Sequence, residues 1–192
     1  MRYALYGFSL NLLYLFMRLC LFIKLFIYSF ILLEYWLQNY GTKSYILILD
    51  FRDTFFQKDP FLDFGPYSTR KPIYDLQLFA ENWNVKDIGK CAFNSLWIGR
   101  CFSKESLQEL KKQAVICSGS TLGSFIGIDY YISIMLSWMD KLKCWKKGIE
   151  SDQGYQNFLF YKGHFNTVIG NATLNYQGVG VVNTIGAMNG KR

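Results

Sequence analysis

Two acidic residues follow a short apolar run and are the first candidates for chemistry. The run Tyr45–Leu49 is apolar throughout, Asp50 follows it directly, and Asp53 comes three positions later. Carboxylate oxygens are the ligands that Mg²⁺ and Mn²⁺ prefer, and these ions are commonly shared with the phosphates of a substrate. In the structural alternative, Asp50 caps a turn and Asp53 pairs with Arg52 or Arg70. We interpret the two carboxylates as a metal and phosphate site.

These residues need a strand to position them. A short apolar run bounded by turn residues is typical of a strand buried on both faces, so 45–49 predicts a strand of a mostly parallel sheet flanked by helices. Ligands bind at the carboxyl ends of strands in such sheets, which is where Asp50 stands. In the rest of the chain, short apolar runs typical of strands alternate with longer segments of helical periodicity, and this alternation predicts an α/β fold. Further strands are expected at 76–80, 114–117, 165–169 and 179–185, and helices at 25–40, 103–113, 126–141 and 153–161.

The acidic segment also resembles a known signature. The residues that carry the resemblance are Asp50, Arg52, Asp53, Phe56, Gln57, Asp59, Pro60 and Phe61. Their pattern is similar to that of an uncharacterised eukaryotic family, well represented in plants, which is related to glycosyltransferases of the GT-A fold. The resemblance covers roughly residues 28–190. It differs in one respect, because the Asp-x-Asp spacing of those enzymes is Asp-x-x-Asp here.

The resemblance implies a GT-A-like (Rossmann-like) domain that is incomplete at both ends. It implies that Asp50 and Asp53 hold Mn²⁺ or Mg²⁺ against a nucleotide sugar, while Arg52 offsets nearby charge. GT-A enzymes often add a C-terminal His to the metal shell, and that region lies beyond the last residue of this chain. We expect His164, the single histidine, to be a surface or strand residue rather than a ligand or a general base.

A second candidate segment, 118–123, combines two glycines with three hydroxyl side chains between a predicted strand and a predicted helix. Backbone N–H groups in such a turn, with a helix N-terminus behind them, can hold a phosphate or a sugar hydroxyl. The alternative is an ordinary tight turn with a capping Ser or Thr. We assign four residues of this segment to cofactor binding: Ser118, Gly119, Ser120 and Thr121.

A third candidate segment begins a predicted helix with Ser151, Asp152 and Gln153. Similar Asp-Gln pairs followed by Asn recur near the reaction centre of GT-A enzymes. This resemblance implies that Asp152 and Gln153 are catalytic residues that orient the acceptor or the transferring sugar. Gln153 and Asn157 are four residues apart and share one helical face, where both can hydrogen-bond sugar hydroxyls. Otherwise, Asp152 caps the helix and the two amides are solvated.

The apolar N-terminal segment divides the chain into two predicted regions. Residues 1–24 predict a signal anchor or targeting segment, and residues 25–192 predict the partial glycosyltransferase domain. Two alternatives stay open: 3–37 as one buried helix, or 3–40 as a membrane hairpin. Four cysteines outside the apolar N-terminus and a glycosylation acceptor at Asn171 favour the secretory pathway. We therefore expect a lumenal domain on a Golgi or endoplasmic reticulum membrane.

Composition limits the remaining function classes. The formal net charge is +7, yet no Gly-rich basic tract or aromatic–basic repeat indicates a nucleic-acid surface. Cysteine and histidine spacing gives no zinc-type cluster. The expected function is metal-assisted transfer of a sugar from a nucleotide sugar to a glycan or glycoprotein. The alternative is a membrane-associated pseudoenzyme or binding module of the same fold, with an incomplete donor site.

Overall fold

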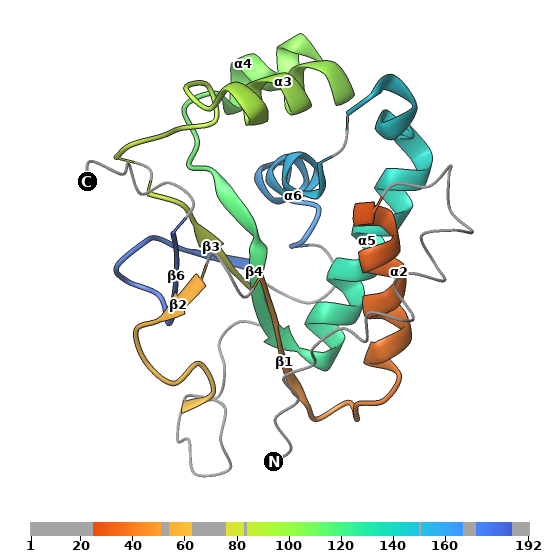
Figure 1. Ribbon diagram of the computed structural model, residues 1–192, viewed down its shortest axis with the longest axis vertical. Helices are drawn as coiled ribbons and strands as arrows, with labels where there is room; N and C mark the ends of the chain where they lie inside the picture. The colour runs from red at the N-terminus through yellow and green to blue at the C-terminus, as the bar shows by residue number, and fades with distance from the viewer. Residues whose placement is uncertain are drawn as a thin grey trace.

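The computed structural model describes residues 25–50, 54–62, 76–82, 84–149, 151–166 and 172–185 (Figure 1). Along the described chain, one helix is followed by three strands, two helices, one strand, two more helices and two strands. The strands are β1 (Tyr45–Leu49), β2 (Thr54–Phe56), β3 (Leu76–Ala80), β4 (Ile116–Ser124), β5 (Ala172–Asn175) and β6 (Val182–Thr184). The helices are α2 (Leu25–Leu37), α3 (Ala92–Cys101), α4 (Lys104–Leu110), α5 (Phe125–Leu142) and α6 (Asp152–Tyr161), and Cys144–Lys147 forms a 3₁₀ turn, η2.

The main sheet has four strands in the order β1-β4-β3-β5. Its longest strand, β4, pairs antiparallel with both β1 and β3, and β3 pairs parallel with β5. The predicted mostly parallel, GT-A-like sheet is therefore wrong. An apolar run shows which side chains are buried but carries no information on strand direction, and the alternation of strands and helices was mistaken for parallel crossover units.

The packing of β1 shows why an apolar run can resemble a strand of a parallel sheet. It is an edge strand with half-buried side chains, yet it packs on both faces of the sheet. Ile46 and Ile48 contact the main core, whereas Leu47 and Leu49 contact a smaller core on the opposite face. Apolar packing on two sides thus arises in an antiparallel edge strand, without the parallel neighbours that the sequence suggested.

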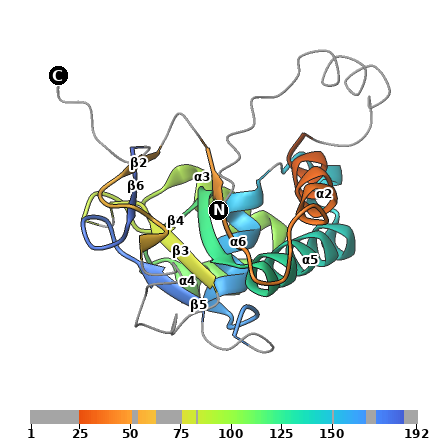
Figure 2. The same ribbon diagram turned by 90° about the horizontal axis from the view of Figure 1, so that it is seen from below.

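Three helices, α2, α5 and α6, lie on one face of the sheet (Figures 1 and 2). Among the described residues, the opposite face carries the two-stranded β2–β6 sheet, which differs from the expected flanking of the sheet by helices. Phe79, Leu122 and Val182 form the small core between the two sheets. The larger core lies between the main sheet and the helices, where Tyr131 and Tyr155 are almost completely buried.

Local signals fix the ends of the two helices nearest the candidate residues. Ser124 begins α5 by accepting a hydrogen bond from the Gly127 N–H, and Ser151 begins α6 by accepting one from the Gly154 N–H. The α5 helix ends at Lys143, which adopts the left-handed conformation with φ of 48°. These caps lie within two residues of the predicted helix starts, because a cap depends on near neighbours in the sequence.

The predicted helix over 25–40 is confirmed as α2, which packs against α5. None of the helices in the described ranges is long and apolar enough to cross a membrane. The signal anchor or targeting segment predicted at 1–24 lies outside the described residues. Near the other end, 165 and 166 are not in a strand, so the strand predicted from 165 is wrong there; the strand in this region is β5.

Candidate functional site

The candidate site begins at the carboxyl end of β1, where Asp50 continues the antiparallel ladder. Its N–H donates to the Gly119 carbonyl at 2.6 Å. A Cβ at position 119 would lie 2.8 Å from the Asp50 Cβ, so Asp50 extends directly across the glycine. Asp50 is exposed. Glycine at position 119 therefore lets an accessible carboxylate lie close against β4.

The second carboxylate of the site is Asp152, the first residue of α6. It is partly exposed, and one carboxylate oxygen accepts a hydrogen bond from the Gln153 N–H at 2.7 Å. The Ser118 side chain of β4 acts on the same carboxyl group and lowers its pKa. An acidic residue in a first helical turn is stabilised by the N–H groups and dipole of the helix. The α6 N-terminus and β4 together fix the position of this carboxyl group.

The two carboxylates are electrostatically coupled. Burial raises the pKa of Asp152 above its ordinary value, and the charge of Asp50 raises it further. Hydrogen bonds from the Gln153 N–H and the Ser118 side chain lower the same pKa, without cancelling the effect of burial. Carboxyl groups with perturbed pKa values and specific charged neighbours are candidates for functional sites.

We expect the raised pKa of Asp152, caused mainly by burial, to make the stability of the protein depend on pH. Because the pKa of Asp152 is raised on folding, the unfolded chain loses this proton at lower pH than the native protein does. The free energy of unfolding should therefore fall as pH rises from about 4, the unfolded carboxyl pKa, through the raised native value. Asp152→Asn should remove this decline, which thermal unfolding followed from about pH 4 to 8 would measure. A difference in melting temperature between the two proteins that stays constant over this range would contradict the raised pKa.

Gln153 links the site to an acidic residue that the sequence analysis missed. Its side-chain nitrogen donates to a carboxylate oxygen of Glu81 at 3.1 Å. Glu81 directly follows β3, and its N–H donates to the Val115 carbonyl at 2.8 Å. Its position was the available signal in the sequence, because Glu81 follows the predicted 76–80 strand as Asp50 follows the 45–49 strand. The two strands end at the same side of the candidate site.

Asn157 is not the solvated or ligand-binding amide that its spacing suggested. It is completely buried and joins α6 to β4. Its side-chain oxygen accepts from the Ile116 N–H at 2.9 Å, and its side-chain nitrogen donates to the Ile116 carbonyl at 2.9 Å and to the Gln153 carbonyl at 2.8 Å. Asn157 thus holds the first turns of α6 against the sheet and positions Asp152 indirectly.

The predicted turn at 118–123 is wrong, because these residues belong to strand β4. Residues 120–123 pair with β1 and 121–123 pair with β3, whereas 118–120 lie where the register with β3 shifts between Leu78 and Ala80. Ser120 and Thr121 are completely buried, whereas Ser118 and Gly119 are partly exposed. Of the four predicted residues, Ser118 and Gly119 therefore line the candidate site directly.

Cys117, next to Ser118, lies under the site. Burial raises the pKa of its thiol to about 12, and the charges of Glu81 and Asp152 act in the same direction. The thiol therefore stays protonated at neutral pH and is a poor nucleophile. Cys91 is also buried and reduced.

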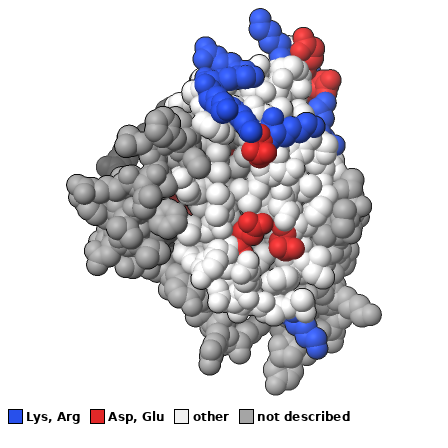
Figure 3. All heavy atoms as spheres, turned by 90° about the vertical axis from the view of Figure 1, so that its right-hand side faces the viewer, with Lys and Arg blue, Asp and Glu red and all other residues white. Residues whose placement is uncertain are grey.

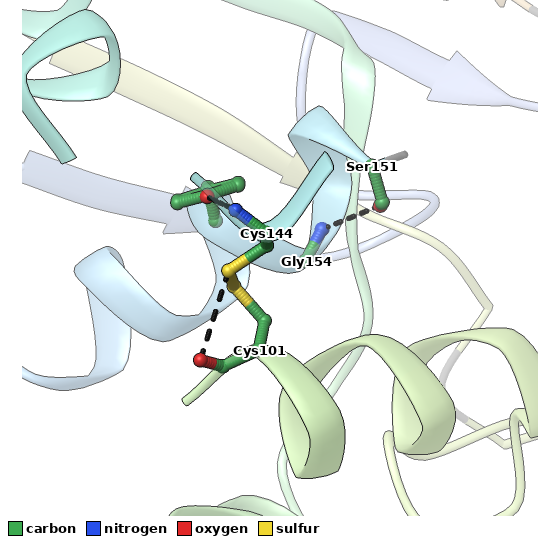
Figure 4. The surroundings of a disulfide bond; sticks show 5 residues. Cys101, Cys144, Ser151 and Gly154 are labelled. Atoms are coloured by element: carbon green, nitrogen blue, oxygen red, sulfur yellow. Dashed lines mark hydrogen bonds between the residues drawn. A yellow bond between two sulfur atoms is a disulfide. The ribbon is translucent and has the colours of Figure 1, made fainter. Parts of the chain in front are cut away.

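A disulfide between Cys101 and Cys144 joins the end of α3 to η2 (Figure 4). The Cys144 N–H donates to the Tyr155 hydroxyl of α6 at 3.4 Å. Gly154 lies against α3, where an added Cβ would stand 2.9 Å from the Trp97 Cβ. The disulfide, the tyrosine and this close helix contact together fix the N-terminus of α6, which carries Asp152.

The residues fit a divalent cation that is shared with a ligand better than one enclosed by protein alone. Asp50 supplies the hard oxygen donors that Mg²⁺ and Mn²⁺ prefer, and Mg²⁺ sites often use one or two carboxylates with substrate phosphates. Within the described ranges, no group of three or more His, Cys, Asp or Glu side chains could hold a metal ion. The predicted partners Arg52 and Asp53 lie outside those ranges.

His164 lies in the turn that follows α6 and is half-buried, which differs from the surface or strand position predicted for it. Its ring contacts Trp138, with 4.8 Å between ring centroids, and its N–H donates to the Leu159 carbonyl. Burial lowers the pKa of its imidazole, and the charge of Lys141 lowers it further. His164 is part of the packing between α5 and α6.

Comparison of the chain with family models, curated proteins and solved structures gave no match.

Proposed function

We propose that this protein transfers a sugar from a nucleotide-sugar donor to a glycan or glycoprotein acceptor, with the help of Mn²⁺ or Mg²⁺. One observation carries the proposal: the side chain of Asp50 lies against Gly119 of β4, and its charge raises the pKa of Asp152, which comes from a distant part of the sequence. The resemblance of the acidic segment and of the Asp-Gln pair to glycosyltransferase motifs supports the same chemistry.

The cost of the carboxylate pair argues for function. Burial and a like-charged neighbour both disfavour the ionised form of Asp152, so this position is less stable than a neutral residue of similar shape would be. Residues that lower stability without structural need are commonly retained for binding or catalysis. Asp152 needs no cap role, because the Ser151 side chain already caps α6.

Each residue then has a distinct task in the proposed reaction. The carboxylate of Asp50 is accessible and would hold the cation near the diphosphate of the donor. A divalent cation at this point neutralises the charge that develops on the departing nucleotide diphosphate. Asp152, oriented by the Gln153 N–H and Ser118, would accept a hydrogen bond from a sugar hydroxyl. Asp53 and Arg52 remain proposed members of the donor site.

Ligand-induced stabilisation tests the proposal. The melting temperature is measured with Mn²⁺ or Mg²⁺, alone and with each of several nucleoside diphosphates, and release of nucleotide is then followed for the corresponding sugar donors. We expect one metal–nucleotide pair to raise the melting temperature, since a ligand that binds the native state stabilises it. Asp50→Asn and Asp152→Asn should each lose this rise and reduce turnover by about 100-fold or more.

Asp129→Asn provides the matched control, because Asp129 is an exposed residue of α5 outside the site. It should behave like the unmodified protein in both measurements. Stabilisation without turnover on any donor would favour the binding-module alternative. No stabilisation by any metal–nucleotide pair, or equal loss in all three variants, would contradict the proposed site.

A further inference from the structure

Basic residues gather around the disulfide, at positions that the proposed transfer reaction does not use. Six basic residues lie within three positions of one or other half-cystine: Arg100, Lys104, Lys141, Lys143, Lys146 and Lys147. The same two stretches, 98–104 and 141–147, contain no acidic residue. We refer to these six residues as the basic cluster.

The disulfide brings the two stretches together. The Cα atoms of Cys101 and Cys144 are 5.3 Å apart, although 43 residues separate them in the sequence. Because three residues of extended chain span at most about 10 Å, the backbone of every member lies near the disulfide. The sequence alone showed the lysines at 141–147 as a short run, and Arg100 and Lys104 join them only through the fold.

The basic side chains are available to a partner. Five of the six are exposed, and Lys143 is the exception. Among the described residues, Lys143 is also the one member that forms an ion pair, with Asp140 at 3.3 Å, and this pair is itself largely exposed. Figure 3 shows Lys and Arg side chains gathered at the upper end of the drawn face, with a few acidic side chains beside them. Such a concentration of one charge sign attracts anionic ligands.

Two tryptophans add a second kind of contact to the cluster. The Lys141 ammonium lies over the Trp138 ring at 4.8 Å from its centroid, and the Lys146 ammonium lies 5.4 Å from the centroid of Trp145. Both rings are half-buried, so part of each remains accessible. Ammonium groups beside aromatic rings suit a ligand with both anionic groups and apolar faces.

We propose that the basic cluster binds an acidic oligosaccharide, that is, a glycan carrying sulfate or carboxylate groups. Such a chain offers anionic groups to the lysines and the C–H faces of its sugar rings to the tryptophans. The disulfide supports this choice over a nucleic acid, because disulfides persist in oxidising compartments that glycans share. The inference stands whether or not the protein transfers sugars.

Binding of heparin oligosaccharides, measured by titration at about 0.1 M salt, tests the proposal. Lys146→Glu/Lys147→Glu should weaken binding by about tenfold or more, and higher salt should weaken binding by the unmodified protein. Arg100→Glu/Lys104→Glu should also weaken binding, because the cluster includes both sides of the disulfide. The matched control is Lys111→Glu/Lys112→Glu, which makes the same change in net charge at an exposed pair outside the cluster.

The outcomes distinguish specific binding at the basic cluster from attraction that depends only on the net charge of the protein. Equal weakening in all three double variants would show that net charge alone is responsible and would overturn the proposal. Tighter binding to a DNA duplex or to anionic phospholipid vesicles than to heparin would overturn the choice of a glycan as partner. Melting temperatures of the variants close to that of the unmodified protein would exclude misfolding as the cause of lost binding.

Discussion

Asn157→Leu is expected to lower the free energy of unfolding by about 3–5 kcal/mol, one of the largest single-residue effects in this protein. The substitution keeps the number and branching of the side-chain heavy atoms but removes all three hydrogen bonds of the buried amide. It leaves the Ile116 N–H, the Ile116 carbonyl and the Gln153 carbonyl without that partner in the interior. Each such loss costs about 1–3 kcal/mol. Denaturant unfolding followed by circular dichroism would measure the change.

Two further variants make the expectation specific to the amide. Asn157→Asp keeps an acceptor for the Ile116 N–H but loses the donor to both carbonyls, so it should also be strongly destabilised. Asn39→Leu replaces an exposed asparagine and should change stability by less than about 0.5 kcal/mol. If Asn157→Leu were as stable as Asn39→Leu, the attachment of α6 to β4 through this residue would be refuted.

Loss of the disulfide is expected to be the other large effect. Replacing both Cys101 and Cys144 by Ser releases a loop that spans 43 residues. The chain-entropy relation for a loop of this length gives a stabilisation of about 4 kcal/mol, because the cross-link restricts the unfolded chain. A loss of this size is a large fraction of the typical stability of a domain. Melting temperatures with and without a reducing agent would measure it.

The two forms serve as controls for each other. The unmodified protein should melt at a lower temperature after reduction, whereas Cys101→Ser/Cys144→Ser should be insensitive to the reducing agent. Cys117 should not confound the measurement, because its buried thiol has a pKa of about 12 and reacts slowly. If the double variant melted together with the oxidised protein, the disulfide would contribute nothing to stability.

The sequence predicted the local elements well, because their signals are local. Apolar periodicity located β1, β3, α2, α5 and α6, and the capping residues Ser103 and Ser151 marked helix starts through contacts three residues away. The sequence also pointed to Asp50 from its place after a predicted strand, whereas Asp152 was proposed from the resemblance of the Asp-Gln pair to glycosyltransferase motifs. Four cysteines suggested disulfides, without indicating which residues pair.

Strand direction, pairing and the composition of the site depended on contacts between distant segments. The antiparallel pairing of β4 with β1 and β3 turned the expected phosphate-binding turn at 118–123 into strand and buried Ser120 and Thr121. It also placed Gly119 beside Asp50, and the charge of Asp50 acts on Asp152 at the start of α6. Side-chain periodicity records which face of an element is buried, but it does not record which neighbour covers that face or in which direction the neighbour runs. The sequence by itself therefore determined most of the elements and proposed the carboxylates, and the tertiary structure decided how the strands pair and which of the proposed residues are buried.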